Sequence, residues 1–258
     1  MSLPPDPRIV PPWRWPRPEE LLRSVAAWLW SALIFVLAPL SAVLTFGLAA
    51  ERLAAFWAPI WGRGGLRLLG IEVEIRGLHH LHNAGSCILV ANHQSAVDLL
   101  VGAALAPRAP LALAKAELKW LFPFNLMWIA LGQRFVDRRN PEAARRSVDG
   151  IVAALRRSPR TVILAPEGTR SRTGHLGPFK TGAFHMAVAA RVPIVPVCIH
   201  FAGLRMPPGR MWAERGRCLV DVHPPVPTED WTVDQVRAQA LVLEEQYRRW
   251  LAAEAGNA

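Results

Sequence analysis

The side chains best suited to chemistry stand together in residues 92–98 of this 258-residue chain. Residues 88–91 form an apolar run typical of a buried strand, and four polar residues follow it directly. Ser95 and Asp98 have the spacing of a helix start, with Ser95 as the N-cap and Asp98 three residues later. The chain therefore turns between His93 and Asp98, and only such a turn lets the carboxylate reach the imidazole ring.

An imidazole held by a carboxylate can take a proton from a hydroxyl group, so His93 and Asp98 are the candidate catalytic pair. The alternative is that Asp98 only caps a helix and that His93 is an ordinary loop histidine. The spacing by itself leaves both interpretations open.

Charged residues also follow two other predicted strands. Residues 134–136 precede Asp137 and Arg138, and residues 161–165 precede the run Pro-Glu-Gly-Thr-Arg at 166–170. Arginine offers a planar pair of donors that fits phosphate oxygens, so an arginine at a strand end can bind a phosphate group. A solvated turn is the alternative for each of these two clusters.

The run N-H-Q-S-A-V-D at residues 92–98 resembles the first signature block, N-H-x-x-x-x-D, of the glycerolipid acyltransferases, specifically the 1-acyl-glycerol-3-phosphate acyltransferases. Three more blocks follow in the same order, at residues 132–139, 166–170 and 192–197. Ala165 departs from the pattern, because the family usually has phenylalanine before the third block. Residues 121–125 also differ from the usual order Pro-Phe-Phe-Gly, which affects only the local loop.

The resemblance implies a role for each matched residue. Lys115 would lie near the phosphate of the acyl acceptor, Glu167 and Arg170 would orient one another and the acceptor, and Gly168 would permit close approach of the backbone. Lys180, after the third block, either faces a phosphate or CoA or is a plain surface residue. The implied catalytic residues are His93 and Asp98, and the implied substrate-binding residues are Lys115, Arg138, Glu167, Gly168, Thr169 and Arg170.

The implied reaction is transfer of a fatty acyl chain from acyl-CoA or acyl carrier protein to the free hydroxyl of 1-acyl-glycerol-3-phosphate, which gives phosphatidic acid. No cofactor and no metal is expected, and no carboxylate or cysteine completes a metal site with the histidines at 79, 80 and 82. No G-x-S-x-G elbow is present, which argues against an α/β-hydrolase. The alternatives are another lyso-lipid acceptor (a lyso-ornithine lipid or another lysophospholipid), a CoA-independent transacylase, and a non-catalytic protein of the membrane surface.

The composition favours a membrane over nucleic acid as the partner. The formal net charge is +10 and 52% of the residues are hydrophobic. The basic residues are scattered and no nucleic-acid recognition motif accompanies them, whereas an anionic membrane or a phosphorylated substrate suits the same charge. An arginine excess that reflects only the base composition of the genome is the alternative. The three cysteines have no metal spacing and are expected to be buried and inert.

The first part of the chain is expected to form a proline-rich, poorly ordered arm at 1–18 and a membrane-associated helical hairpin at 19–65. Residues 24–50 carry no charge, and as one helix they would be roughly 40 Å long against a hydrocarbon core of about 30 Å. Pro39 is expected to divide the run into helices at about 21–38 and 40–61. The glycines at 62, 64 and 65 are expected to mark the exit into the acyltransferase domain at 66–258.

The apolar run at residues 24–50 has three possible placements: a re-entrant hairpin in the membrane, a single membrane span, or a helix buried in a soluble core. Arginines flank the run on both sides, so the positive-inside rule gives no strong asymmetry and the hairpin is favoured. A signal peptide is disfavoured, because the run is too long and no cleavage site follows it. The expected location is the cytoplasmic face of the inner membrane, in contact with membrane lipid.

Strand and helix patterns alternate through the rest of the chain. Strands are predicted near residues 71–75, 88–91, 111–115, 134–137, 161–165, 192–197 and 217–222, and helices near 141–157, 182–190 and 235–253. This alternation predicts an α/β fold with a mixed sheet flanked by helices, as the resemblance also implies. The polar blocks would lie at strand ends, where open α/β sheets bind ligands. Glu244 and Glu245 on the last helix are expected to belong to an ordinary solvated face.

Overall fold

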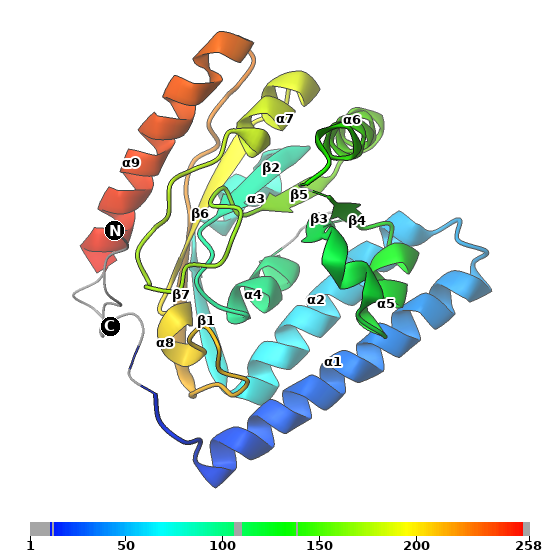
Figure 1. Cartoon of the computed structure of the whole chain (residues 1–258), viewed down its shortest axis with the longest axis vertical. Helices are drawn as coiled ribbons and strands as arrows, with labels where there is room; N and C mark the ends of the chain where they lie inside the picture. Colours follow the sequence, from blue (N-terminus) through cyan, green and yellow to red (C-terminus); the bar gives the residue numbers. More distant parts are fainter. Residues whose placement is uncertain (1–10, 12, 106–109, 138, 255–258) are drawn as a thin grey trace.

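The computed structural model describes residues 11, 13–105, 110–137 and 139–254. At the centre of this described part lies a seven-stranded sheet (Figure 1). In spatial order its strands are β1 (Ile71–Arg76), β7 (Gly216–Val222), β6 (Ile194–His200), β2 (Cys87–Ala91), β5 (Thr161–Leu164), β3 (Pro110–Lys115) and β4 (Arg134–Val136).

The sheet is mixed, as the sequence predicts. Strands β6, β2, β5, β3 and β4 all run in the same direction. Strand β7 is antiparallel to β6, and β1 is parallel to β7. The carboxyl ends of β2, β5, β3 and β4 therefore meet at one edge of the sheet. The first and third predicted blocks follow β2 and β5, and the second contains β4 and ends beyond it, so the topology brings the ends of these strands to one edge.

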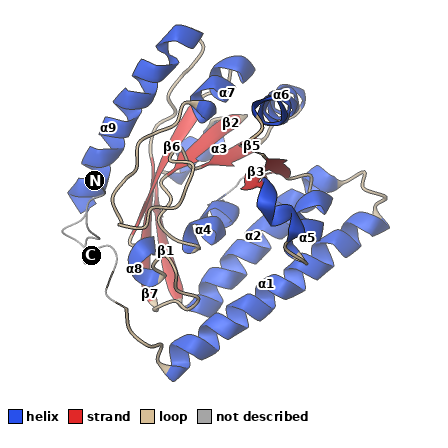
Figure 2. Cartoon of the chain, in the orientation of Figure 1, coloured by secondary structure: helices blue, strands red, loops and turns tan. Residues whose placement is uncertain are grey.

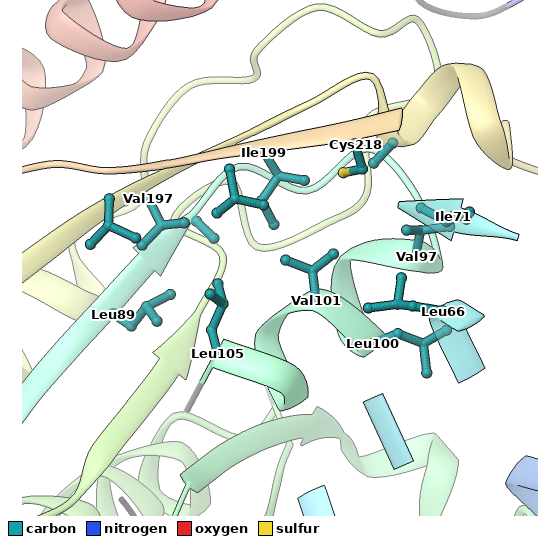
Figure 3. Packing of buried hydrophobic residues seen from close by; sticks show 14 of the residues in the cluster. Leu66, Ile71, Leu89, Val97, Leu100, Val101, Leu105, Val197, Ile199 and Cys218 are labelled. Carbon is teal, nitrogen blue, oxygen red and sulfur yellow. The ribbon is translucent and has the colours of Figure 1, made fainter. Parts of the chain in front are cut away.

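Helices cover both faces of the sheet (Figure 2). The residues of β2 are buried on both faces, with Leu89 in the cluster on one face and Ile88 and Val90 in the cluster on the other. The first face packs against α1 (Pro18–Leu44), α2 (Ala50–Leu69) and α4 (Val97–Leu105), as Figure 3 shows for α4. The second packs against α6 (Pro141–Arg157), α7 (Gly182–Ala190) and α9 (Val236–Glu254).

Shorter helices connect these elements: α3 (Leu78–Asn83), η1 (Ala116–Trp120), α5 (Phe124–Ala130), α8 (Ala202–Arg205) and η2 (Val233–Gln235). Two predicted helix starts are confirmed. Asn140 accepts a hydrogen bond from the backbone of Ala143 before α6, and Thr232 forms a capping box with Gln235 before α9. All three cysteines are buried and free of disulfides, as expected.

The N-terminal helices are a pair, but the predicted division at Pro39 is wrong. Helix α1 continues through Pro39 to Leu44 and ends in a Schellman turn. Here the N–H of Gly47 donates to Ala42 O (2.8 Å) and that of Phe46 to Val43 O (3.0 Å), with both residues at positive φ. A proline removes one helical hydrogen bond, whereas the left-handed residues reverse the chain, so the turn falls at 45–49.

The expected exit at the three glycines is also wrong, because they lie inside α2, which continues to Leu69. A Cβ atom at Gly62 would stand 2.4 Å from Leu100 O of α4, and one at Gly64 would stand 2.5 Å from Trp30 Nε1 of α1. The glycines therefore allow α2 to lie directly against its two neighbours. In Figure 1, α2 lies between α1 and α4.

The described part of the N-terminal arm is docked, which corrects the expectation of a poorly ordered segment. The Arg14 guanidinium pairs with Glu20 (2.6 Å) and with Glu214 (2.9 Å) in the loop before β7. The Trp13 ring packs edge-on against Trp212, with 4.9 Å between the ring centroids. Residues 1–10 and 12 lie outside the described residues.

Gly62 lies in the close contact between α2 and α4, whereas Gly150 in α6 has open space around it, so substitution by alanine should have opposite effects at the two positions. Gly62→Ala should lower the free energy of unfolding by roughly 1–3 kcal/mol, because the new methyl group meets backbone atoms that cannot move aside. Gly150→Ala in α6 should raise it by about 0.5–1 kcal/mol, because a Cβ there has no neighbour within 4 Å and alanine favours the helix. Thermal unfolding of both variants in one detergent compares them, and equal shifts would contradict the packing.

Candidate active site

The predicted turn brings His93 and Asp98 into contact. His93 Nδ1 lies 2.9 Å from Asp98 Oδ2. The same oxygen accepts hydrogen bonds from the backbone N–H groups of Gln94 (2.7 Å) and Ser95 (2.8 Å). Asp98 is almost completely buried, whereas the His93 side chain is 23% exposed. The imidazole can therefore meet a substrate while its carboxylate partner is shielded from water.

The start of α4 fixes this geometry through the predicted cap. The Ser95 hydroxyl oxygen accepts from the Val97 N–H (3.1 Å), and the Asp98 carboxylate reaches back to the Ser95 N–H. The first bond is a side-chain cap at the start of the helix, and the acid that returns the second bond is also the partner of the histidine. The Ser95 hydroxyl in turn donates to Met206 O (2.7 Å), which ties the cap to the loop after α8.

The contacts of Asp98 also determine what the imidazole can do. An ionised carboxylate only accepts hydrogen bonds, so Nδ1 of His93 carries the proton that it donates to Asp98. The other ring nitrogen, Nε2, then has a lone pair that can accept a proton from a hydroxyl group. Asp98 Oδ1 is buried and has no hydrogen-bond partner among the described residues.

The turn that follows β5 holds the backbone of His93 on both sides. Extending the β2–β5 register by three residues brings His93 level with Glu167. The His93 N–H donates to Glu167 Oε1 (2.8 Å), and the Ser171 N–H donates to the carbonyl oxygen of His93 (2.8 Å). The first and third blocks are therefore parts of one site.

Glu167 has different partners from those that the resemblance implies. Its second oxygen, Oε2, accepts from the Gly177 N–H (2.8 Å), so both carboxylate oxygens bind backbone N–H groups rather than Arg170. The side chain is buried, and this burial raises the pKa of the Glu167 carboxyl to about 7, although the two N–H donors act in the opposite direction. These contacts position the site, and a role as a substrate ligand stays a prediction.

Two polar residues of the first block have structural roles that the sequence reasoning missed. The Asn92 side chain exchanges two hydrogen bonds with the backbone of Ile199, at 2.8 and 2.9 Å, and so continues the β2–β6 pairing beyond the strand. The Gln94 amide donates to Gly174 O (2.8 Å) in the loop after the third block. The sequence signal that could have indicated these roles is the presence of amide side chains directly before and after His93.

The remaining predicted ligands lie at the same edge or outside the described residues. Extending the β3–β5 register by three residues brings Lys115 level with Pro166, and Lys115 is exposed at the end of β3. Thr169 and Arg170 are exposed in the turn after β5. Arg138 lies outside the described residues. The described residues contain no group of three or more metal-ligating side chains.

An apolar pocket lies next to the catalytic pair, between α1, α2 and the first turn of α4. Its walls include Trp28 and Ser31 from α1, Trp61 from α2, and Val97 with Leu100 from α4. Since Val97 directly precedes Asp98, the pocket and the carboxylate that binds His93 share the first turn of α4.

Comparison with solved structures shows the fold. The crystal structure of the 1-acyl-sn-glycerophosphate (LPA) acyltransferase from Thermotoga maritima matches with a TM-score of 0.73, at 23% sequence identity, over 91% of this chain and 96% of that chain. Residues 72–200 match the family model described as Acyltransferase. This range contains the catalytic pair and the turn that holds it, so the fold and the site define an acyltransferase.

Sequence relatives make the assignment more specific. The mouse 1-acyl-sn-glycerol-3-phosphate acyltransferase alpha is 39% identical over 175 residues, which cover 67% of this chain and 61% of the mouse protein, less than two thirds of its length. The 1-acyl-sn-glycerol-3-phosphate acyltransferase of Salmonella typhimurium is 35% identical over 182 residues, which cover 69% and 74% of the two chains. The chain belongs to the 1-acyl-sn-glycerol-3-phosphate acyltransferase family, as its four blocks predict.

The buried Glu167 predicts a pH-dependent stability. Because its pKa is raised from 4.5 to about 7, the folded state holds this proton more tightly than the unfolded state, and stability falls as the pH rises through this window. Glu167→Gln removes the titration, so its unfolding midpoint relative to that of the wild type should increase from about pH 5 to about pH 8.

Glu245→Gln on the exposed face of α9 is the matched control and should give a constant difference. Thermal unfolding in one detergent over this pH range measures both variants. A constant difference for Glu167→Gln as well would mean that the carboxyl does not titrate in this window.

Proposed function

We propose that the protein transfers a fatty acyl chain from the thioester of acyl-CoA or acyl carrier protein to the free hydroxyl of 1-acyl-glycerol-3-phosphate, giving phosphatidic acid. The observation that carries this proposal is the His93 imidazole, bound to Asp98 through Nδ1 and partly exposed at the edge where the three blocks meet. The names of the two sequence relatives, both 1-acyl-sn-glycerol-3-phosphate acyltransferases, support the same acceptor.

The proposed reaction is a single displacement. His93 Nε2 takes the proton of the acceptor hydroxyl while its oxygen attacks the thioester carbonyl carbon. The new C–O ester bond forms, the C–S bond breaks, and the thiolate leaves with the electron pair and then receives the proton. Asp98 stabilises the imidazolium that forms in between, as the aspartate of a serine-type triad does. Holding both substrates in place supplies much of the rate.

Positive charge at the sheet edge suits the phosphate of this acceptor. Lys115 and Arg170 are exposed there and form no salt bridge among the described residues. Charge-assisted hydrogen bonds to a phosphate are among the stronger polar contacts, and arginine can make two at once. Arg138 remains a proposed ligand on the resemblance alone. The apolar pocket beside α4 suits a fatty acyl chain of one of the two substrates.

We propose that the helix pair rests in one leaflet of the membrane, at its cytoplasmic face. Helix α1 is long and apolar enough to cross a membrane, yet only 28% of its most apolar window is buried in the described structure. Phe46 and Leu48 at the tip of the pair are each 90% exposed. Exposed apolar residues on the neighbouring η1–α5 segment, Trp120 and Phe122 among them, extend the same surface.

A thiol-release assay tests the reaction. Purified protein with an acyl-CoA should release thiol when 1-acyl-glycerol-3-phosphate is added, and His93→Ala should lose this turnover by at least about 1,000-fold because no base remains. Membrane association of the variant should be unchanged, because His93 is not part of the apolar surface. Near-normal turnover in His93→Ala would refute the role of His93 as base.

A panel of acceptors separates the alternatives in the same assay. Preference for a lyso-ornithine lipid or another lysophospholipid over 1-acyl-glycerol-3-phosphate would replace the proposed acceptor but leave the proposed acyl transfer unchanged. Lipid binding without thiol release for any acceptor would favour a non-catalytic membrane protein.

The placement of the helix pair predicts the topology of the chain. Tags at both termini should be equally accessible to a protease from the cytoplasmic side of sealed membrane vesicles, since a hairpin returns the chain to the side from which it enters. Access to the N-terminal tag from the opposite side only would instead mean that α1 spans the membrane.

A further inference from the structure

Residues 177–180 connect the turn after β5 to the C-terminal helix. On the turn side, the Gly177 N–H donates to Glu167 Oε2 and the Lys180 N–H donates to Pro166 O, both at 2.8 Å. This segment is therefore paired at two points with the turn that also holds the backbone of His93.

On the other side, Phe179 is held by α9. Its N–H donates to Glu244 Oε2 (2.8 Å), and its carbonyl oxygen accepts from the Arg237 guanidinium (3.2 Å). Its ring is buried against Tyr247, with ring centroids 5.1 Å apart. Glu244 thus binds the active-site segment, which corrects the expectation that it only lies on a solvated face. The backbone of the next residue, Lys180, is fixed by these contacts.

The Lys180 side chain lies across the turn at Gly168. A Cβ atom at Gly168 would stand 2.9 Å from Lys180 Nζ and 3.0 Å from its Cδ, and Gly168 has a positive φ of 73°. Any larger residue at this position would displace the lysine. Lys180 is exposed and forms no salt bridge among the described residues.

We propose that the Lys180 ammonium group binds a phosphate group of a substrate above the Gly168 turn. The proposal rests on the proposed function and adds a ligand that the four blocks do not assign. The backbone of Lys180 is fixed by the contacts on both sides, so only its side chain has to be ordered when an anion binds. Thr169 and Arg170, which directly follow Gly168 in the chain, are also exposed. Two substrates can supply the phosphate: the monoester of the acceptor and the phosphates of CoA.

The test compares Lys180→Met with Lys180→Arg in turnover and in binding without turnover. For Lys180→Met we expect the KM of the phosphate-bearing substrate to rise about 10-fold, while kcat changes less than about 3-fold. This rise corresponds to the loss of one charge-assisted hydrogen bond. Lys180→Arg should restore most of the affinity, because it keeps the charge. Arg249→Met, which removes one exposed positive charge from α9, is the matched control and should leave both constants unchanged.

Binding measured without an acyl donor uses three probes: 1-acyl-glycerol-3-phosphate, monoacylglycerol and free CoA. Weaker binding of the first in Lys180→Met, with monoacylglycerol unaffected, supports contact with the acceptor phosphate; weaker binding of CoA alone supports contact with the donor. Equal binding of all three probes to Lys180→Met and wild type would overturn the proposal. Because this measurement needs no turnover, it stays decisive if the wild type fails to transfer acyl groups, a result that would refute the proposed function alone.

Discussion

Oδ2 of Asp98 accepts three hydrogen bonds, from the imidazole of His93 and from two consecutive backbone N–H groups, and the geometry of the site depends on this atom. The backbone donors place the carboxylate, and the carboxylate then selects the tautomer and orientation of the ring. Because all three donors converge on one oxygen, the other is left buried and unpaired among the described residues. A buried polar atom without a hydrogen-bond partner lowers the stability of the fold, and this one lies at the candidate active site.

Parallel strands give this pair its surroundings. The carboxyl ends of β2, β5 and β3 lie at one edge, so three segments far apart in the sequence supply the base, the turn that holds it and an exposed lysine. Glu167 links the loops of this edge, because one of its carboxylate oxygens accepts from the His93 N–H and the other from the Gly177 N–H. The third block therefore supports the first block through Glu167, while its Thr169 and Arg170 stay exposed.

Much of the fold was predictable because periodic patterns and cap residues are local. The strands and the cap at Ser95 follow from neighbouring residues, whereas the spacing of His93 and Asp98 left two interpretations open and the resemblance implied their pairing. The end of α1 was not predictable from Pro39, because a packed helix tolerates a proline and the reversal depends on left-handed residues further on. Tyr247 shows the same limit: its hydroxyl accepts from the Val197 N–H and donates to Val90 O, so it bridges the pairing of β6 with β2. Only the folded chain shows that a side chain of α9 takes part in this strand pairing.

The glycines of α2 connect the apolar helix pair with the chemistry. Gly62 and Gly65 bring α2 against Leu100 of α4, the helix whose first turn carries Asp98. The surface proposed to rest in the membrane and the carboxylate that orients His93 are therefore two helices apart, with no flexible linker between them. A lyso-lipid held at the membrane surface would meet an imidazole whose height above that surface is set by helix packing. Because the apolar pocket lies between the same three helices, its walls and the base are positioned by the same contacts. A change at the α2–α4 contact would therefore shift the walls of the pocket and the first turn that carries Asp98 together.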